Sequence, residues 1–504
     1  MPHPAAALMI LGTASNVGKS WLCTGLCRLL ARRGYRVAPF KAQNMSNNAA
    51  PAIGPNGYGE IGRAQAVQAE AAGLAPHVDM NPVLLKPTGM IGSQVVVLGE
   101  AVGHLKAREY RAQRARWWAA VTGAYGRLAA SHDVIVIEGA GSPAEFNLRD
   151  GDIVNMAMAH HAEANALLVG DIDRGGVFAS LMGTLALLEP GDRERFKGFV
   201  INRFRGDPSL LTPALAPFDA MTGIPVRGVI PMREDLDIDA EDSQVLKGGR
   251  LVDPALLDIC VLRLPTVSNF TDLEVLGRSP GAQVRYVRAP EDIGNPDLLV
   301  IPGAKDTLSD LAWMRRRGLD RAVAAAAARG VPTLGVCGGY QMLGRRLIDA
   351  DGHGGSAGAA DGLGLLPVET TFNGEKYTRP AAGHTRGGWL LPAGLPVEGY
   401  EIHQGVTATS GQPLVDLDSG PDGAIAGCVA GSYLHGLLDR PEPRRALLDA
   451  LRARRGLTPL APGEDVDPAA YRARQYDGVA DLLERHLDLD GLLPPARAPE
   501  RPGT

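Results

Sequence analysis

Short apolar runs alternate with longer amphipathic segments along the first half of the chain. We predict a helix over residues 20–33 and a strand for each apolar run, over 7–11, 35–39, 134–137, 166–169, 198–201 and 226–230. Strands that alternate with helices are typical of a parallel sheet covered by helices on both faces. The pattern therefore predicts an α/β domain with a parallel sheet.

A second series of strands begins after an acidic, glycine-containing segment at 234–250. Its predicted strands cover 257–262, 284–287, 298–301, 333–336 and 427–434, with a hairpin-like region before the last one. From about residue 441 to about 487 the pattern is helical, and residues 493–504 are rich in Pro and Arg. We predict four parts: an α/β domain over 1–235, a linker over 236–255, a second α/β domain over 256–445, and a helical extension over 446–504 with a disordered tail.

Composition and charge narrow the possible classes of protein. The chain has 504 residues, of which 45% are hydrophobic and 21% charged, as in folded multidomain proteins. The net charge of −5 supplies no positive field, so we expect neither a nucleic-acid partner nor a membrane partner. The five cysteines form no CxxC pair, and the chain has neither an apolar run of 18 residues nor a leader-like start. We expect a cytoplasmic protein.

Lysine is scarce in this chain. Only 8 of the 51 basic residues are lysines, so each lysine is an exception that merits attention. Three of them, Lys19, Lys41 and Lys86, lie near the N-terminus.

The first predicted strand leads into a glycine-bearing loop and then a helix. The loop runs from Gly12 through Thr13 to Gly18, Lys19 and Ser20, with Thr13 standing where the first glycine of GxxxxGK[ST] would be. Backbone N–H groups and a helix N-terminus can hold phosphate, the lysine can reach the terminal phosphates, and the serine can ligate Mg²⁺. The alternative is a structural turn before a helix.

Polar residues follow three of the predicted strands at their carboxyl ends, where ligands of open α/β sheets bind. Glu138 is a candidate metal ligand. Asp171 and Asp173 could hold a second metal or shape a substrate pocket, or could pair with Arg174. Asn202 carries a donor and an acceptor that could read an adenine edge.

A cysteine in the second domain follows a predicted strand directly and precedes a predicted helix. Cys337 lies between Gly335 and Gly338, which is typical of a nucleophile elbow with a free backbone N–H for an oxyanion. The alternative is a small buried core cysteine. A nucleophilic cysteine needs a base, and the two candidates are His435 and His403.

Five segments of the first half together resemble the cobyric acid synthase family, whose N-terminal half is similar to dethiobiotin synthetase. They are GTASNVGKS at 12–20, FKAQNMSNN at 40–48, EGAGSPAEFN at 138–147, GDIDRGGVF at 170–178 and INRFRGD at 201–207. The resemblance implies that Lys19 and Lys41 contact the phosphates of ATP, and that Ser20 and Glu138 hold Mg²⁺.

The pattern GVCGGYQ at 335–341 with a later YLHG at 433–436 resembles a class I glutamine amidotransferase domain, which is flavodoxin-like. This resemblance implies that Cys337 is the nucleophile and His435 the base. It also implies that Gly338 and Gly303 contribute to the oxyanion hole and that Gln341 binds glutamine.

One position departs from most amidotransferases of this class. They carry Glu two residues after the histidine, whereas this chain has Leu437. The departure is typical of the cobyric and cobyrinic acid branch, and it leaves open what orients the histidine.

The two resemblances together imply an ATP- and glutamine-dependent ligase. Its expected reaction is amidation of the b, d, e and g side-chain carboxylates of adenosylcobyrinic acid a,c-diamide. The guanidinium group of arginine can bind a carboxylate through two parallel hydrogen bonds. We therefore expect Arg174, Arg203 and Arg205 to bind that substrate, together with Asp171 and Asp173.

Three alternatives remain. The nearest is cobyrinic acid a,c-diamide synthase, which shares both domains. A partition ATPase of the ParA/MinD kind would carry a second lysine five residues before Lys19, where this chain has Ala14. A scaffold with an inactive amidotransferase domain would not need Cys337 and His435.

Overall fold

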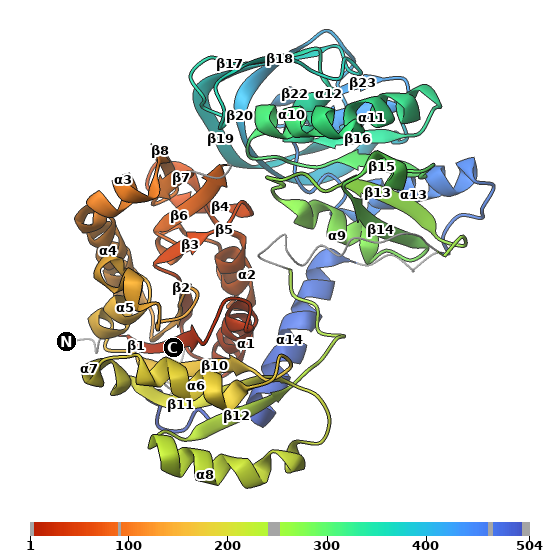
Figure 1. Ribbon diagram of the computed structural model, residues 1–504. Helices are drawn as coiled ribbons and strands as arrows, with labels where there is room; N and C mark the ends of the chain where they lie inside the picture. The colour runs from red at the N-terminus through yellow and green to blue at the C-terminus, as the bar shows by residue number, and fades with distance from the viewer. Residues whose placement is uncertain (1–4, 89–91, 240–252, 462–466, 496–504) are drawn as a thin grey trace, which may run out of the picture.

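The computed structural model describes residues 5–88, 92–239, 253–461 and 467–495. Two α/β bodies lie side by side, the first built mainly from the N-terminal half and the second from the C-terminal half (Figure 1). Most of the predicted linker, residues 240–252, lies outside the described residues, as do 1–4 and the end of the predicted tail, 496–504. Among the described helices, none is both long and apolar enough to span a membrane.

A six-stranded parallel sheet forms the centre of the first body, as the strand pattern predicts. Its order is β12-β11-β10-β1-β9-β2. The strands are β1 (Ala6–Gly12), β2 (Val37–Phe40), β9 (Val134–Glu138), β10 (Asn165–Asp171), β11 (Phe196–Phe204) and β12 (Val226–Pro231).

Helices cover both faces of this sheet, which explains why the central parts of its strands are largely apolar on both sides. On β1, Leu8 and Ile10 pack in one buried cluster with α1, whereas Met9 and Leu11 pack in another with α4 and α6. The helices of this body are α1 (Lys19–Arg32), α2 (Arg63–Ala71), α3 (Ala107–Ala112), α4 (Arg114–Ser131), α5 (Met156–His161), α6 (Val177–Ala186), α7 (Pro190–Arg193) and α8 (Thr212–Thr222).

An insertion between β2 and α4 extends from the first body toward the second. The sequence pattern did not predict its small sheet, β3-β6-β7-β8, or its hairpin, β4-β5. The strands are β3 (Gln43–Met45), β4 (Ala49–Gly54), β5 (Gly57–Gly62), β6 (Val83–Thr88), β7 (Gly92–Val97) and β8 (Glu100–Leu105).

The second body holds another six-stranded sheet, with the order β14-β13-β15-β16-β24-β23 and only the edge strand β23 antiparallel. Its strands are β13 (Leu257–Leu262), β14 (Ala282–Val287), β15 (Leu298–Ile301), β16 (Thr333–Val336), β23 (Ala424–Ala426) and β24 (Val429–Ser432). Its helices are α9 (Glu274–Gly277), α10 (Thr307–Arg317), α11 (Leu319–Ala328) and α12 (Gly338–Leu343).

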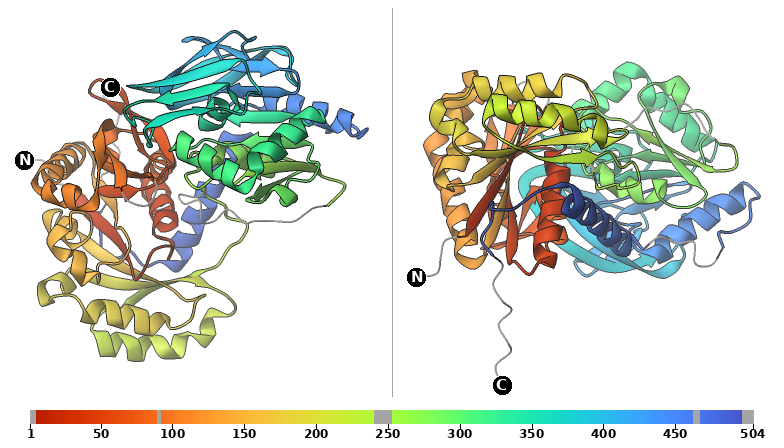
Figure 2. Two further views of the ribbon diagram at one scale, coloured as in Figure 1. Left: turned by 45° about the horizontal axis from the view of Figure 1, so that its top comes forward. Right: turned by 90° about the horizontal axis from the view of Figure 1, so that it is seen from below.

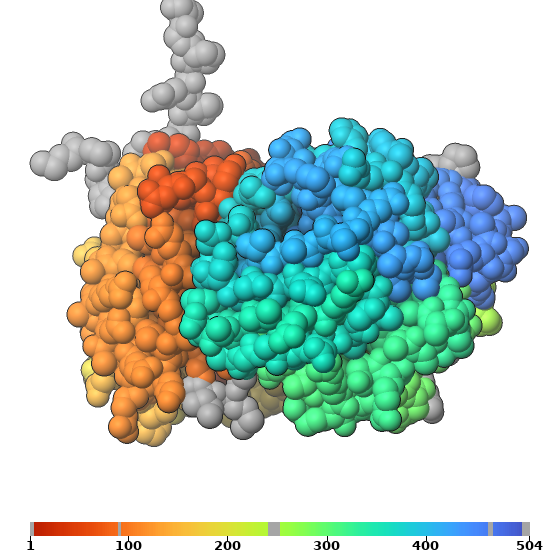
Figure 3. All heavy atoms as spheres, turned by 90° about the horizontal axis from the view of Figure 1, so that it is seen from above, coloured from red at the N-terminus to blue at the C-terminus, as the bar shows by residue number. Residues whose placement is uncertain are grey.

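The predicted hairpin-like region is a second sheet of this body, dominated by two long antiparallel strands. Its order is β18-β17-β19-β21-β22, with β20 paired to β19. The strands are β17 (Arg346–Asp349), β18 (Gly358–Asp361), β19 (Val368–Arg386), β20 (Ala393–Thr409), β21 (Val415–Leu417) and β22 (Gly420–Asp422). This sheet abuts the insertion of the first body (Figure 3).

The C-terminal segment differs from the continuous helical pattern predicted for it. Two helices form, α13 (Pro441–Arg454) and α14 (Pro468–His486), and residues 455–461 between them are not helical. Gly456, with φ 71°, ends α13 in the left-handed conformation that glycine favours. Helix α13 packs in the core of the second body, whereas α14 returns to α1 of the first (Figure 2).

Helix α14 lies very close to α1. A Cβ atom on Gly25 of α1 would lie 2.5 Å from Cγ1 of Val479 and 2.7 Å from Cδ1 of Leu483. Arginines of α1 pair with acids of α14 at the exposed edge, as in Arg32 Nη1 to Asp481 Oδ1 at 2.7 Å. The apolar contact therefore holds the C-terminal helix, and the ion pairs line its rim.

We expect Leu483→Ala to destabilise the first body by about 2–5 kcal/mol, because it empties a fully buried position. Asp481→Ala, which removes only the exposed ion pair, should cost less than about 1 kcal/mol. Urea unfolding of the two variants measures the difference. Equal shifts of the unfolding midpoint would contradict this account of the helix contact.

Candidate active site

The glycine-bearing loop between β1 and α1 is held against β10 and β11. Thr13 donates its backbone N–H to the carbonyl of Val169 at 2.9 Å. Gly18 has φ 98°, and a Cβ atom there would lie 2.2 Å from Nδ2 of Asn202. Asn202 Nδ2 donates to the carbonyl of Val17 at 2.8 Å. Its side-chain donor thus supports the loop, and only glycine fits at position 18.

Lys19 at the start of α1 lies across this loop. Its Nζ donates to the carbonyls of Ala14 and Gly141, both at 2.9 Å. A Cβ atom on Gly12 would lie 3.0 Å from the same Nζ, so glycine at position 12 leaves room for the lysine. The arrangement places an ammonium group beside the first turn of a helix, where backbone N–H groups and the helix dipole favour phosphate.

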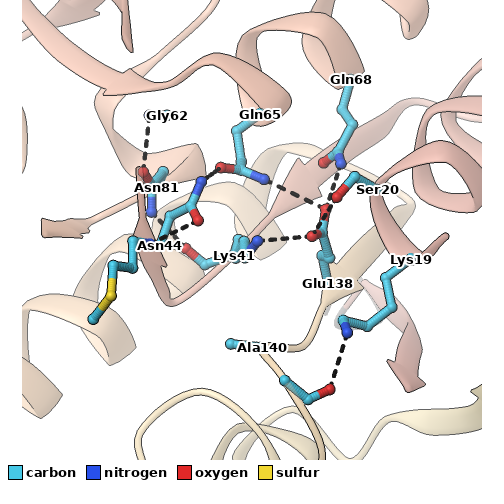
Figure 4. Close-up of polar contacts among 12 residues, drawn as sticks. Lys19, Ser20, Lys41, Asn44, Gly62, Gln65, Gln68, Asn81, Glu138 and Ala140 are labelled. Carbon is cyan, nitrogen blue, oxygen red and sulfur yellow. Dashed lines mark hydrogen bonds and ion pairs between the residues drawn. The ribbon is translucent and has the colours of Figure 1, made fainter. Parts of the chain in front are cut away.

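Glu138, at the end of β9, joins several of the predicted site residues (Figure 4). Its Oε1 accepts from Ser20 Oγ and from Lys41 Nζ, both at 2.8 Å. Its Oε2 accepts from Gln68 Nε2 at 2.6 Å and lies 3.5 Å from Gln65 Nε2. The carboxylate is buried, so these donors offset the loss of its hydration.

These oxygens suit a magnesium ion that binds together with a nucleotide. Ser20 Oγ and Glu138 Oε1 are hard donors that lie together, and Lys41 shows that a positive charge is accepted beside Oε1. Mg²⁺ in P-loop proteins takes few protein ligands, because phosphates and water complete its octahedron. Within the described residues, no cluster of three or more His, Cys, Asp or Glu side chains could hold a metal by itself.

The acids and arginines predicted to bind substrate pair with one another at the carboxyl edge of the sheet. Asp171 Oδ2 lies 2.8 Å from Arg203 Nη1 and 3.8 Å from Arg174 Nε. Asp173 Oδ1 lies 2.8 Å from Arg205 Nε. They form an ion-pair cluster near the loop, and their role in substrate binding stays a prediction.

A cavity of about 690 Å³ is lined by Gly141 and lies between the loop after β9 and the small sheet of the insertion. This volume falls within the range of small-molecule sites. Met45 and Leu148 line it and are 61% and 46% exposed, so its lining offers apolar surface to a ligand. Arg111 and Arg149 also line it, whereas the paired acids and arginines of the sheet edge do not.

Cys337 occupies the sharp turn between β16 and α12. Its φ is 50° and its ψ is −110°, a strained conformation for a residue with a side chain. The turn is held by the Cys337 N–H, which donates to the carbonyl of Ser432 at 2.9 Å. A Cβ atom on Gly339 would lie 1.9 Å from the carbonyl oxygen of Ile301, so glycine is required there. The predicted elbow is present.

His435 lies buried next to this elbow and contacts an acid from a distant segment. Its Nδ1 lies 2.6 Å from Oδ2 of Asp272, in the 3₁₀ helix Phe270–Leu273. Its Nε2 lies 3.4 Å from Nδ2 of Asn269. Burial alone would lower the pKa of His435, but Asp272 and a hydrogen bond with Cys337 raise it to about 10. Asp272 is therefore an acid in position to orient His435, in a chain that has Leu437 where most amidotransferases of this class carry glutamate.

The residues predicted for the oxyanion hole and for glutamine surround the same elbow. A Cβ atom on Gly303 would lie 3.5 Å from Cε1 of His435, and one on Gly338 would lie 2.8 Å from the backbone nitrogen of Ala304. Gln341 lines the pocket at Cys337, but protein groups occupy its amide: Oε1 accepts from Thr307 Oγ1 at 3.0 Å, and Nε2 donates to the carbonyl of Gln404 at 2.9 Å.

His403, the second candidate base, also lines this pocket but is packed differently. Its ring stacks between Tyr377 and Tyr433, with centroids 5.0 and 3.7 Å away. Its Nε2 lies 3.8 Å from Oε1 of Glu401, and the pKa of that glutamate is lowered to about 2, since His403 and Arg379 outweigh the effect of burial. The geometry favours His435 as the partner of Cys337.

Comparison with known proteins agrees with this two-site arrangement. Residues 8–245 match the CobQ/CobB/MinD/ParA nucleotide binding domain, and residues 258–443 match the CobB/CobQ-like glutamine amidotransferase domain. Three cobyric acid synthases are similar over nearly the whole chain. The protein of Desulforudis audaxviator is 50% identical over 97% of this chain and 99% of its own length. The protein of Sorangium cellulosum is 50% identical, with 96% and 97% covered, and that of Yersinia enterocolitica is 48% identical, with 97% of each covered.

The chain belongs to the cobyric acid synthase family.

Membership in the cobyric acid synthase family makes the chain an ATP-dependent, glutamine-using amidating ligase. It also confirms the predicted fold class, a P-loop parallel-sheet body joined to a glutamine amidotransferase body. The a,c-diamide synthase and the partition ATPase are not favoured by these relatives.

Sequence reasoning missed several residues that the fold brings to these sites of the cobyric acid synthase. Asp272 carries no motif, because its partner His435 is far away in the chain. Lys305 and Lys376 line the pocket at Cys337 beside Lys86. The scarcity of lysine was the one available signal, since five of the eight lysines lie at the two sites.

We expect Asp272→Asn to lower the glutaminase rate on the order of 10²- to 10⁴-fold, as loss of the orienting carboxylate does in comparable triads. The variant also removes the charge that raises the pKa of His435, so the ring should lose its proton at lower pH. The alkaline limb of the glutaminase pH profile should move toward neutrality. The measurement is glutamate release between about pH 6 and 10.

Glu291→Gln, an exposed acid of the same body, serves as the control and should leave the profile in place. Amidation from ammonium salt should survive in both variants. An unchanged alkaline limb in Asp272→Asn would show that Asp272 does not set the protonation of His435.

Proposed function

We propose that this protein, acting in the cytoplasm, converts adenosylcobyrinic acid a,c-diamide to cobyric acid by amidating the b, d, e and g side-chain carboxylates, with glutamine and ATP as co-substrates. Two features support the proposal. The family relationship extends over nearly the whole chain, and Cys337 with His435 and Lys19 with Glu138 form two separate sites. The observation that carries the proposal is the Cys337 elbow facing the buried His435–Asp272 pair.

The glutaminase half begins with the thiolate of Cys337, which attacks the side-chain amide carbon of glutamine. His435 gives its proton to the departing ammonia, and the raised pKa of His435 keeps that proton available at neutral pH. We assign the oxyanion to the backbone N–H groups around Gly338 and Gly303, two residues that lie at the elbow. Water then cleaves the thioester and releases glutamate.

The ligase half activates a carboxylate of the corrinoid. A carboxylate oxygen attacks the γ-phosphorus of ATP, ADP leaves, and ammonia displaces phosphate from the acyl phosphate. Lys19 and Lys41 offset the charge of the phosphates. When bound, Mg²⁺ at Ser20 and Glu138 would neutralise the phosphate oxygens.

The cavity beside Gly141 is the place where we expect the corrinoid to bind. It adjoins the carbonyl that accepts from Lys19, so a carboxylate arm there lies near the end of the triphosphate. Its apolar lining suits the ring, and Arg111 suits an acidic arm. Arg149, also in the lining, is paired with Asp192 and Glu189.

We expect Cys337→Ala to abolish amidation supported by glutamine and to keep amidation supported by ammonium salt, because only thioester formation needs the sulfur. Amide formation with each nitrogen donor, followed by mass spectrometry of the corrinoid, measures this. Cys428→Ala, at a half-buried cysteine outside both sites, should behave as the wild type. Equal loss with both donors would contradict the role of Cys337.

We expect Lys19→Ala to abolish amidation with either nitrogen donor, since loss of a preorganised phosphate contact costs on the order of a hundredfold or more in rate. Lys19→Arg should fail nearly as badly, because the space beside Gly12 suits a compact ammonium group. Glutamate release at Cys337 should continue. A Lys19→Ala enzyme that still makes amide from ammonia and ATP would place the nucleotide elsewhere.

A further inference from the structure

The pocket at Cys337 is completed by a residue of the nucleotide-binding half. Lys86, on β6 of the insertion, lines it together with Lys305 and Lys376 of the amidotransferase half. Among the described residues, no acid and no arginine lines this pocket, and its lysines are these three.

One buried carboxylate, that of Glu60, pairs with two of the three lysines. Glu60, on β5, is fully buried; it accepts from Lys86 Nζ at 2.8 Å and also bonds Lys376. Lys305 has a weaker contact, 3.5 Å from Oε1 of Gln404. Asp306, the neighbouring acid, bonds Ser309 N at 3.1 Å and Ser356 Oγ at 2.7 Å.

The pocket therefore holds a surplus of positive charge. Burial together with Lys376 and Lys86 lowers the pKa of Lys305 to about 7, and burial is the main reason that the pKa of Lys376 falls to about 8. Ammonium groups packed this closely are costly unless an anion joins them.

A second observation also indicates that a ligand belongs here. The side chain of His403 is 92% buried, given its 8% exposure, and its Nδ1 has no hydrogen-bond partner among the described residues. His403 lines the same pocket. Buried polar atoms are normally satisfied, so this nitrogen leaves a hydrogen bond for a polar ligand or a water molecule to make.

We propose that Lys305, Lys376 and Lys86 bind the α-carboxylate of glutamine while its side-chain amide lies against Cys337. The nucleotide-binding half then completes the glutamine pocket, so glutamine hydrolysis depends on the contact between the two halves. This inference rests on the proposed function, because it takes glutamine as the substrate of Cys337. The pocket formed by these lysines would select free glutamine over analogues whose α-carboxyl group is amidated.

The test compares hydrolysis of the side-chain amide, measured as ammonia release, for L-glutamine and for L-glutamine α-amide. Both substrates are assayed with wild type and with Lys305→Met. Wild type should prefer glutamine on the order of 10- to 100-fold in kcat/KM, the usual effect of a hydrogen bond between charged groups. Lys305→Met should lose most of this preference through a higher KM for glutamine, with kcat nearly kept. Lys305→Arg should recover part of it.

Lys86→Met tests the contribution of the nucleotide-binding half and should reduce the preference in the same way. Lys197→Met, at an exposed lysine of β11, is the matched control and should leave the preference unchanged. Amidation from ammonium salt should stay near the wild-type level in Lys305→Met, which shows that the variant is folded.

The two proposals can fail separately in this experiment. A wild type that forms no amide from ammonium salt and ATP would contradict the proposed function. An unchanged preference for glutamine in both Lys305→Met and Lys86→Met would overturn the inference and would leave the lysines as ties between the halves. Loss of preference in Lys305→Met alone would overturn the part assigned to Lys86.

Discussion

A buried contact through Asn269 joins the two halves of the protein next to the catalytic histidine. Its side-chain oxygen accepts from the N–H of Ala49 at 3.0 Å, and its own N–H donates to Asn48 Oδ1 at 2.7 Å. The same side chain lies 3.4 Å from Nε2 of His435. One buried amide therefore joins the insertion of the first body to the histidine of the second, and with φ 50° it adopts the left-handed conformation that Asn tolerates better than most residues.

Helix α2 connects the same interface with the nucleotide site. Arg63, its first residue, bonds the hydroxyl of Tyr400, whose ring stacks on His435 with centroids 5.0 Å apart. Gln68, just over a turn later, donates to Glu138. A short helix thus contacts the surroundings of both reacting centres, and a rigid element of this kind keeps their separation constant.

Charge is distributed differently at the two sites. At the nucleotide site Glu138 is surrounded by donors from Ser20, Lys41 and Gln68, so its negative charge is compensated before any ligand binds. At Cys337 the positive charge of the lysines exceeds the negative charge of Glu60, and His435 contacts Asp272. At the first site, Ser20 and Lys41 can leave Glu138 and bind a nucleotide and its metal instead. The second site is suited to attract a carboxylate.

Local pattern and spacing determined much of this protein. Apolar runs of four to eight residues predicted the parallel strands of both six-stranded sheets, because strands buried on two faces are largely apolar. The residues that chemistry requires next to one another in the chain, such as Gly18 with Lys19 and Cys337 with its glycines, were also visible, since a tight turn needs its special residues within a few positions.

Only the tertiary structure decided which distant residues complete the sites. Asp272 reaches His435 from more than a hundred positions away, and Lys86 reaches the pocket at Cys337 from the other half of the chain. The insertion that carries Lys86 has short strands without a long apolar repeat, so its pattern was too weak to predict. A single Asp or Lys has no neighbours in sequence that mark its role, because the charge it balances belongs to a segment that only folding brings near.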